Sequence, residues 1–221
     1  MNTLQNVEQS YSTELIRKAI HLCSLSIPIA YYFVSKSTAL TILIPITLAF
    51  TLSDLARLLH PPTGRLYERW FGFLLRSHER NDRGRRLNGA SYVLLSATLC
   101  ILVFPKIIVI TAFAILIISD SSAALIGRRY GRHPFMKKTF EGTAAFFLSA
   151  LIVVAVAPKI SYIPAEYAIG AAAALVGSLV EAFSNEVDDN LAIPISISAA
   201  MWLMYVLLLP ALNVFKLEGG I

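Results

Sequence analysis

Long apolar runs separated by short polar segments dominate the chain and give the first expectation for its fold. A helix needs roughly 20 apolar residues to cross a hydrocarbon core of about 30 Å. Runs of this kind predict seven membrane spans. They cover residues 15–34, 38–58, 87–104, 107–126, 142–157, 165–183 and 191–209. The sequence therefore predicts an all-α, polytopic integral membrane bundle that forms a single domain over residues 1–221.

Composition agrees with this pattern. The chain is 56% hydrophobic and only 15% charged, and its mean hydropathy is +0.65. A soluble domain is usually about a quarter charged. The missing charge indicates that much of the surface faces lipid, and it leaves no room for a separate soluble domain.

The distribution of positive charge predicts the orientation. With a cytoplasmic amino terminus, 15 of the 19 lysines and arginines fall in cytoplasmic segments. The outer segments then hold one lysine each, namely Lys36, Lys106, Lys159 and Lys216. Basic loops stay in the cytoplasm, so we expect an N-in, C-out topology. The net charge of +5 does not indicate nucleic acid, because the positives are split among juxtamembrane segments beside anionic lipid.

The longest polar stretch, residues 57–88, carries apolar residues at helical spacing among its arginines. These residues are Leu66, Trp70, Phe73 and Leu74. The pattern predicts an interfacial amphipathic helix in the second cytoplasmic segment. A disordered loop is the alternative.

Several ionisable residues lie at membrane depth, where a charge costs about 2.5–3.5 kcal/mol even on the lenient scale. Asp120 lies in the fourth predicted span and Glu181 in the sixth, each on a face of small residues. Polar groups also gather at the start of the first span and just before the seventh: Glu14, Arg17, His21, Asp188, Asp189 and Asn190. All these positions fall on the side that lysine and arginine alone mark as cytoplasmic. The alternative is that they are ordinary interfacial charges, with Asp120 paired to an arginine.

The segment 127–142 combines glycines with basic residues and follows Asp120 in sequence. Glycine lets backbone amides approach an anion, and Thr139 precedes a new helix whose first amides favour phosphate. The segment contains no P-loop motif, and a loop that serves only topology is the alternative. Acids beside such a loop suggest a divalent metal with a polyphosphate.

Three ordered stretches together resemble a known family. The first is Glu14-x-x-Arg17-Lys18-x-x-His21, and the third is Glu181 followed by Asp189-Asn190-Leu191 and Pro194. The second, and most specific, contains Asp120, Ala123, Gly127, Gly131, Lys138, Glu141, Gly142 and Thr143. These resemble the membrane family of CTP-dependent lipid-alcohol kinases, which includes dolichol kinase, phytol kinase and CTP-dependent diacylglycerol kinase. The chain departs from the family pattern at Ser119, Thr139 and Thr143, where the family has glycine or serine, and a weaker echo runs over residues 87–92.

The resemblance implies transfer of the γ-phosphate of CTP to the hydroxyl of a membrane lipid alcohol, with Mg²⁺ or another divalent cation, on the cytoplasmic side. The membrane would be the plasma membrane in a bacterium or archaeon, and the ER or plastid membrane in a eukaryote. The acceptor stays open among polyprenols, phytol, geranylgeraniol and diacylglycerol.

From the chemistry of the side chains we expect Asp120 and Asp189 to hold the metal or to position the nucleotide, and Lys138 to neutralise phosphates. Glu181 or Asp120 is the candidate base, and His21 is a poorer one. The expected nucleotide-binding residues are Gly127, Arg128, Gly131, Lys137, Lys138, Thr139, Glu141, Gly142 and Asn190. Glu14, Arg17, Lys18 and His21 complete the expected site.

Three other functions fit parts of the pattern. A CTP:phosphatidate cytidylyltransferase would also use CTP, metal and acids, but it would release pyrophosphate and make a CDP-lipid. A non-enzymatic carrier would suit buried acids and small-residue helix faces, although the acids cluster at one face. A purely structural membrane subunit would not need the ordered set of acids, glycines and lysines.

Overall fold

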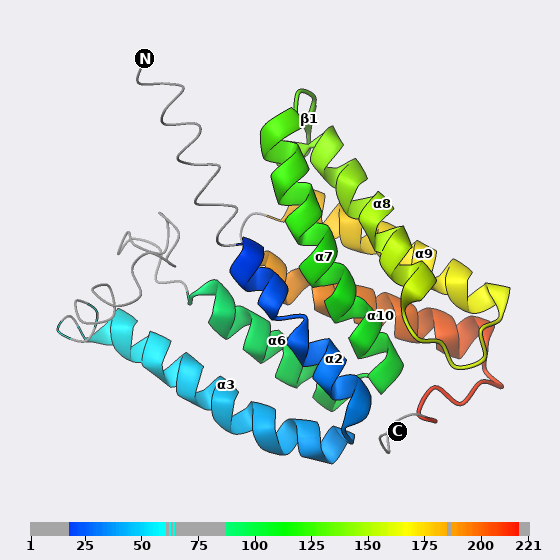
Figure 1. Ribbon diagram of the computed structural model, residues 1–221, viewed down its shortest axis with the longest axis horizontal. Helices are drawn as coiled ribbons and strands as arrows, with labels where there is room; N and C mark the ends of the chain where they lie inside the picture. Colours follow the sequence, from blue (N-terminus) through cyan, green and yellow to red (C-terminus); the bar gives the residue numbers. More distant parts are fainter. Residues whose placement is uncertain (1–17, 61, 63, 65–86, 185–186, 217–221) are drawn as a thin grey trace.

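The computed structural model describes residues 18–60, 62, 64, 87–184 and 187–216, and in these ranges the chain is mostly helical (Figure 1). The helices are α2 (Ser26–Phe33), α3 (Lys36–Leu59), α6 (Gly89–Val103), α7 (Lys106–Tyr130), α8 (Phe140–Val156), α9 (Pro164–Phe183) and α10 (Asp189–Leu208). A short antiparallel hairpin of β1 (Pro134–Phe135) and β2 (Lys138–Thr139) joins α7 to α8. The prediction of a helical bundle is confirmed apart from this hairpin.

Within the described ranges, four helices are long and apolar enough to cross a membrane: α3, α7, α9 and α10. The helices α6 and α8 are also apolar but shorter, with 15 and 17 residues. All six match predicted spans, and the largest difference is at α7, which continues four residues beyond the predicted end at 126. By length and composition, the structure thus supports four of the seven expected spans and indicates a membrane protein. The predicted interfacial helix lies outside the described residues.

The first expected span is not one continuous helix. Residues 18–23 are helical, a turn follows at Ser24 and Leu25, and α2 then begins at Ser26. Pro28 has no amide hydrogen to donate to the carbonyl of Ser24. That carbonyl instead accepts from the Ile27 amide at 2.9 Å, in the tighter pattern of a 3₁₀ turn. The break therefore has a visible cause in the sequence.

The core is built around α7. In its most apolar window 78% of residues are buried inside the bundle, whereas for α3 the figure is 17%. Residues 107–118 of α7 are almost all apolar, so every side of this part of the helix favours burial, and α7 is covered by α2, α8 and α10 (Figure 1). The helix α3 packs mainly along α6, where the hydroxyls of Thr47 and Thr98 lie 2.8 Å apart.

Small residues on α9 bring it close to its neighbours, as its glycine and alanine face predicted. A Cβ added at Gly170 would lie 2.5 Å from Val154 Cγ1, and one at Gly177 would lie 2.6 Å from Ile197 Cδ1. The ends of α7 and α9, the hairpin and the starts of α8 and α10 meet at one end of the bundle, which we call the hairpin end. Glu181 lies one helical turn beyond Gly177 toward this end.

Candidate functional site

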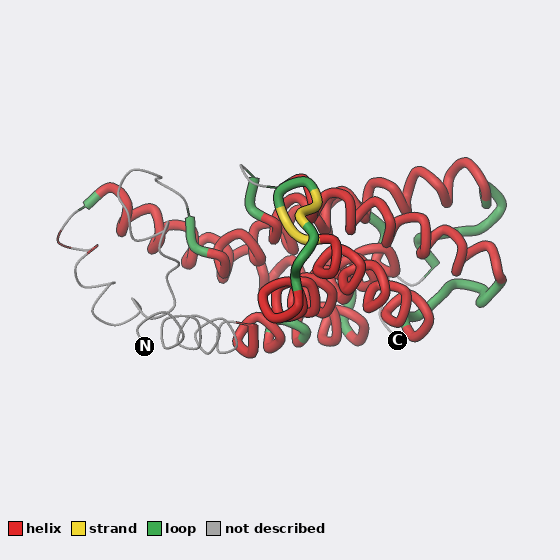
Figure 2. The backbone as a smooth tube through the Cα atoms, turned by 90° about the horizontal axis from the view of Figure 1, so that it is seen from above, coloured by secondary structure: helices red, strands yellow, loops and turns green. Residues whose placement is uncertain are grey.

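The hairpin places Lys138 beside the end of α9. Its two strands pair Pro134 with Thr139 and Phe135 with Lys138, and the turn includes Met136 with a φ of 51°. The backbone amide of Lys137 donates to the carbonyl of Ala182 at 3.1 Å, so the hairpin is tied to α9. Figure 2 shows the two strands at the junction of helices.

Thr139 begins α8 as the sequence predicted, since its hydroxyl accepts the amide of Gly142 at 3.2 Å. The three glycines of the predicted loop surround this residue. A Cβ at Gly131 would lie 2.2 Å from the carbonyl oxygen of Gly127, and one at Gly142 would lie 3.1 Å from that of Ala123. Gly127 is inside α7, so the expected start of the loop at 127 is corrected to 131. In this structure the glycines allow α7, the hairpin and α8 to pack closely.

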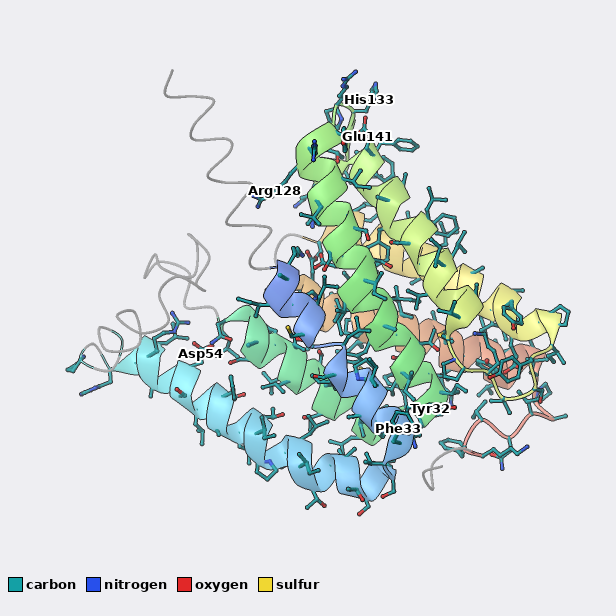
Figure 3. The ribbon with its side chains drawn as sticks, viewed as in Figure 1. Tyr32, Phe33, Asp54, Arg128, His133 and Glu141 are labelled. Atoms are coloured by element: carbon teal, nitrogen blue, oxygen red, sulfur yellow. The ribbon has the colours of Figure 1, made fainter. Side chains whose placement is uncertain are left out.

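Glu141 braces the hairpin from the first turn of α8. Its Oε1 lies 2.7 Å from His133 Nδ1, and its Oε2 accepts the His133 amide at 3.3 Å. Figure 3 shows the two side chains together at the hairpin end. The pKa of Glu141 falls to about 2, chiefly because its own backbone amide donates to the carboxylate and because His133 also does. Glu141 therefore remains charged and holds the two ends of the hairpin together.

Lys138 bridges two carboxylates from different helices. Its Nζ lies 3.1 Å from Glu181 Oε1 on α9 and 3.0 Å from Asp189 Oδ2 at the start of α10. Burial lowers the pKa of Lys138, but the carboxylates of Asp189 and Glu181 outweigh it and keep that pKa above its ordinary value. Within the described residues, Glu181 Oε2 and Asp189 Oδ1 are buried without a hydrogen bond of ordinary geometry, although the Ser184 side chain interacts with the Asp189 carboxylate.

Asp120 forms a separate pair deeper in α7. Lys18 Nζ donates to Asp120 Oδ2, and His21 Nε2 lies 3.8 Å from the same oxygen. Both partners come from the helical piece that precedes the break at Ser24 and Leu25. Among the described residues the partner of Asp120 is thus a lysine, where the alternative named an arginine. Asp120 also interacts electrostatically with Lys138. We call the whole group the acid–lysine cluster: Lys18, His21, Asp120, Lys138, Glu181 and Asp189.

The other expected residues lie around this cluster. Asn190 is buried at the start of α10, and Gly89 approaches it, with 3.4 Å from the position of a Cβ to Asn190 Nδ2. Lys137 is exposed on the hairpin, and Arg128 is exposed on the last turn of α7 (Figure 3). Glu14 and Arg17 lie outside the described residues.

A second buried ion pair escaped the sequence reasoning. Asp54 on α3 is fully buried, its Oδ1 accepts from Arg57 Nε at 2.7 Å, and its Oδ2 accepts the backbone amide of Asn88. Asn88 in turn caps α6 by accepting the amide of Ser91 at 2.8 Å. Figure 3 places Asp54 beside the start of α6. The sequence does carry a signal for this pair, because Asp54 interrupts the apolar run 38–58 and Arg57 follows it by three residues.

The acid–lysine cluster fits a divalent cation through two of its acids. Among the described residues, no group of three or more histidine, cysteine, aspartate or glutamate side chains is placed to hold a metal. Magnesium in phosphate-transferring sites usually takes one or two carboxylates, with substrate phosphates and water completing its shell. Glu181 and Asp189 supply two carboxylates with unused buried oxygens, which matches that pattern.

These features define a class, namely a helical membrane-type bundle with a partly buried cluster of acids and lysines at one end. The chain is 30% identical over 190 residues to the uncharacterized protein RP860 of Rickettsia prowazekii (strain Madrid E). The match covers 85% of this chain and 93% of that protein. The chain belongs to the same family as RP860.

A second similarity is shorter. The chain is 32% identical over 85 residues to CTP-dependent diacylglycerol kinase 1 of Schizosaccharomyces pombe. This match covers 38% of the chain and 37% of the kinase. No family model matches the chain, and no solved structure matches it.

Proposed function

We propose that the chain is a membrane lipid kinase that transfers the γ-phosphate of CTP to the hydroxyl of a lipid alcohol. The observation that carries the proposal is Lys138 held between Glu181 and Asp189 at 3.1 and 3.0 Å, beside the Lys18–Asp120 pair. Phosphoryl transfer needs this combination of carboxylates for a metal and cations for phosphate. The ordered motifs and the partial similarity to the S. pombe kinase support the same function.

We place the hairpin end in the cytoplasm, where CTP is available and where lipid hydroxyls lie at head-group depth. Two of the four lysines assigned to the outer side are buried in the bundle. Lys106 Nζ donates to the Val34 carbonyl at 2.8 Å, and Lys159 Nζ donates to the Val154 and Ala157 carbonyls at 2.7 Å. These contacts neutralise the carbonyl ends of helices. They leave still less exposed positive charge on the outer side, in line with this orientation.

In the proposed reaction the lipid hydroxyl oxygen attacks the γ-phosphorus of CTP. The bond from that phosphorus to the β–γ bridging oxygen breaks, CDP leaves, and the hydroxyl proton passes to a carboxylate. Lys138, with Lys137 and Arg128, binds phosphate oxygens and offsets their charge. Glu181 and Asp189 would hold a divalent cation, whose positive charge would help to neutralise the phosphates.

The geometry divides the acids differently from the sequence expectation, which grouped Asp120 with Asp189 as metal ligands. Lys138 joins Asp189 to Glu181, whereas Asp120 is joined to Lys18 and lies near His21. We therefore assign Asp120 to orienting the lipid hydroxyl and accepting its proton. A loose transition state makes few demands on such a base, so positioning is its main contribution.

The test uses the purified full chain in lipid nanodiscs with four labelled nucleotides and several lipid alcohols. We expect CTP with at least one of polyprenol, phytol, geranylgeraniol or diacylglycerol to yield CDP and a lipid phosphate. Formation of pyrophosphate and a CDP-lipid from phosphatidate would identify a cytidylyltransferase. Ion or solute flux without turnover of any nucleotide would identify a carrier. Either outcome would overturn the proposed function.

A further inference from the structure

The position of Lys138 bears on how a metal ion and a nucleotide would enter the site. Its ammonium group lies between the two carboxylates at ordinary ion-pair distances, 3.1 Å from Glu181 Oε1 and 3.0 Å from Asp189 Oδ2. In the part of the chain that the structure describes, the remaining oxygens, Glu181 Oε2 and Asp189 Oδ1, are buried and make no hydrogen bond of ordinary geometry. The ammonium therefore satisfies half of the oxygens that a cation between the two carboxylates would use.

A divalent cation and the ammonium group cannot share this place. Both would lie within about 3 Å of the same oxygens, and two positive charges so close in a partly buried site repel strongly. Entry of the metal therefore requires Lys138 to turn away from the acids. The charge of Lys138 then needs a new partner, because burial of an unpaired ammonium is unfavourable.

The hairpin allows such a movement of the side chain alone. The Lys138 side chain is 33% exposed, so its stem has space on the solvent side. Its backbone is fixed by pairing with Phe135 and by the neighbouring bond from the Lys137 amide to Ala182. The oxygens of a nucleotide's phosphates, arriving with the metal, are the partners that suit an ammonium group.

We propose that Lys138 is an internal counter-ion that occupies the place of the divalent cation until a metal–nucleotide complex enters, and then moves to the phosphates. This inference rests on the proposed function for the identity of the nucleotide. Its consequence is that metal alone binds weakly, and that metal and nucleotide strengthen each other's binding by the same factor. Lys138 is then the residue that couples the two.

The experiment titrates Mn²⁺ into the full chain in nanodiscs of neutral lipid and follows free Mn²⁺ by electron paramagnetic resonance. For the natural protein, we expect a non-hydrolysable CTP analogue to tighten Mn²⁺ binding by about tenfold. Lys138→Met should bind Mn²⁺ about tenfold more tightly than the natural protein when nucleotide is absent. Lys216→Met removes a lysine far along the chain from the cluster and should leave the titration unchanged.

Adding Glu181→Gln to Lys138→Met should abolish the gain, which ties the bound ion to this pair of acids. Equal Mn²⁺ affinity with and without nucleotide in the natural protein would overturn the inference, even if the variant did not fold. An unchanged Lys138→Met titration in a folded variant would do the same.

The two proposals fail separately. Phosphate transfer from CTP without any gain in Lys138→Met leaves the kinase function standing and removes the counter-ion role. A gain in Mn²⁺ binding by Lys138→Met, in a protein that turns over no nucleotide, supports the exchange at the two acids and overturns the function.

Discussion

The charged side chains at the hairpin end form ion pairs, and Asp120 is the clearest case for testing what such a charge contributes. It accepts from Lys18 inside the bundle, so replacing its carboxylate by an amide keeps the shape and removes the charge. We expect Asp120→Asn to lower phosphate transfer by at least about 100-fold, because the oriented carboxylate is lost where charge develops. The variant should still insert and elute as the natural protein does, which size-exclusion chromatography and circular dichroism would check.

A matched control comes from another buried acid far from the cluster. Glu166 accepts the amides of Ile160 and Ser161 at 2.9 Å and the hydroxyl of Tyr205 at 3.1 Å. Glu166→Gln should lower the stability of the fold while the folded fraction keeps its transfer rate. If both amide variants lost transfer equally, the specific role of Asp120 would be refuted.

Glu141 gives a prediction about pH. Its pKa is lowered from 4.5 to about 2, so the folded hairpin favours the charged form. The stabilisation is complete above pH 4.5 and is lost as the pH falls from 4.5 toward 2. Hydrogen exchange of amides 131–139, corrected for intrinsic rates, should accelerate over this interval. Glu141→Gln should remove that pH dependence, and an unchanged profile in the variant would contradict the bracing role.

At the scale of elements, Asp54 ties α3 to the start of α6. Removing one partner of a buried ion pair costs about 3–5 kcal/mol, because the other charge is left uncompensated. We expect Asp54→Leu to destabilise the fold by an amount in that range. Asp54→Leu with Arg57→Leu should recover part of the loss, which unfolding in mixed micelles at increasing SDS would measure. A double variant less stable than the single one would argue against a paired role.

Two glycines, one beside the hairpin and one inside the bundle, should respond differently to an added methyl group. A Cβ at Gly131 would meet the backbone oxygen of Gly127 at 2.2 Å, which no rotamer change relieves. A Cβ at Gly177 would meet the flexible tip of Ile197 at 2.6 Å. We expect Gly131→Ala to shift the hairpin and lower transfer by about tenfold or more. Gly177→Ala should cost about 1–3 kcal/mol of stability and leave transfer nearly unchanged, as transfer assays and SDS unfolding would test.

Sequence reasoning succeeded for elements whose signal is local. Length and apolarity alone indicate α3, α7, α9 and α10, because the bilayer sets both quantities. Pro28 is a local signal for the break at Ser24, although the apolar run around it predicts one continuous span. The hairpin was not predictable, since its two-residue strands have no periodicity and depend on the distant contact between Lys137 and Ala182.

For the site, the sequence could bring the charged residues to one end of the bundle but could not pair them. The membrane topology determines on which side each helix ends, and this follows from the lengths of the apolar runs. The choice of Lys18 for Asp120, and of Lys138 for Glu181 and Asp189, depends on side-chain direction and on the hairpin. Both are set by tertiary packing, which a single sequence does not display.

For the whole molecule, the two ends of the bundle differ in how their polar groups are satisfied. Glu166 and Lys159 are buried and hydrogen-bonded to nearby backbone, whereas the hairpin end keeps the unused oxygens of Glu181 and Asp189. The contacts of Glu166 and Lys159 stabilise the loop between α8 and α9. The oxygens of Glu181 and Asp189 at the hairpin end could still bind a ligand. In the proposed orientation, the hairpin end faces the cytoplasm.

Cysteine labelling in sealed vesicles would test that orientation. After replacement of Cys23 and Cys100 by alanine, Met136→Cys on the exposed hairpin should react with an impermeant maleimide only in inside-out vesicles. Lys216→Cys should react only in right-side-out vesicles. Reaction of both positions from the same side would exclude an odd number of spans between them.

The burial of α7 has a consequence for how the protein is made. This helix leaves the ribosome before α8 and α10, which cover two of its sides, so it must wait in the bilayer for partners synthesised later. A nascent chain that stops before Asp189 would leave the side of α7 that α10 covers without its partner. Quality-control proteases of the membrane would therefore meet an uncovered central helix in every product that lacks the last helix.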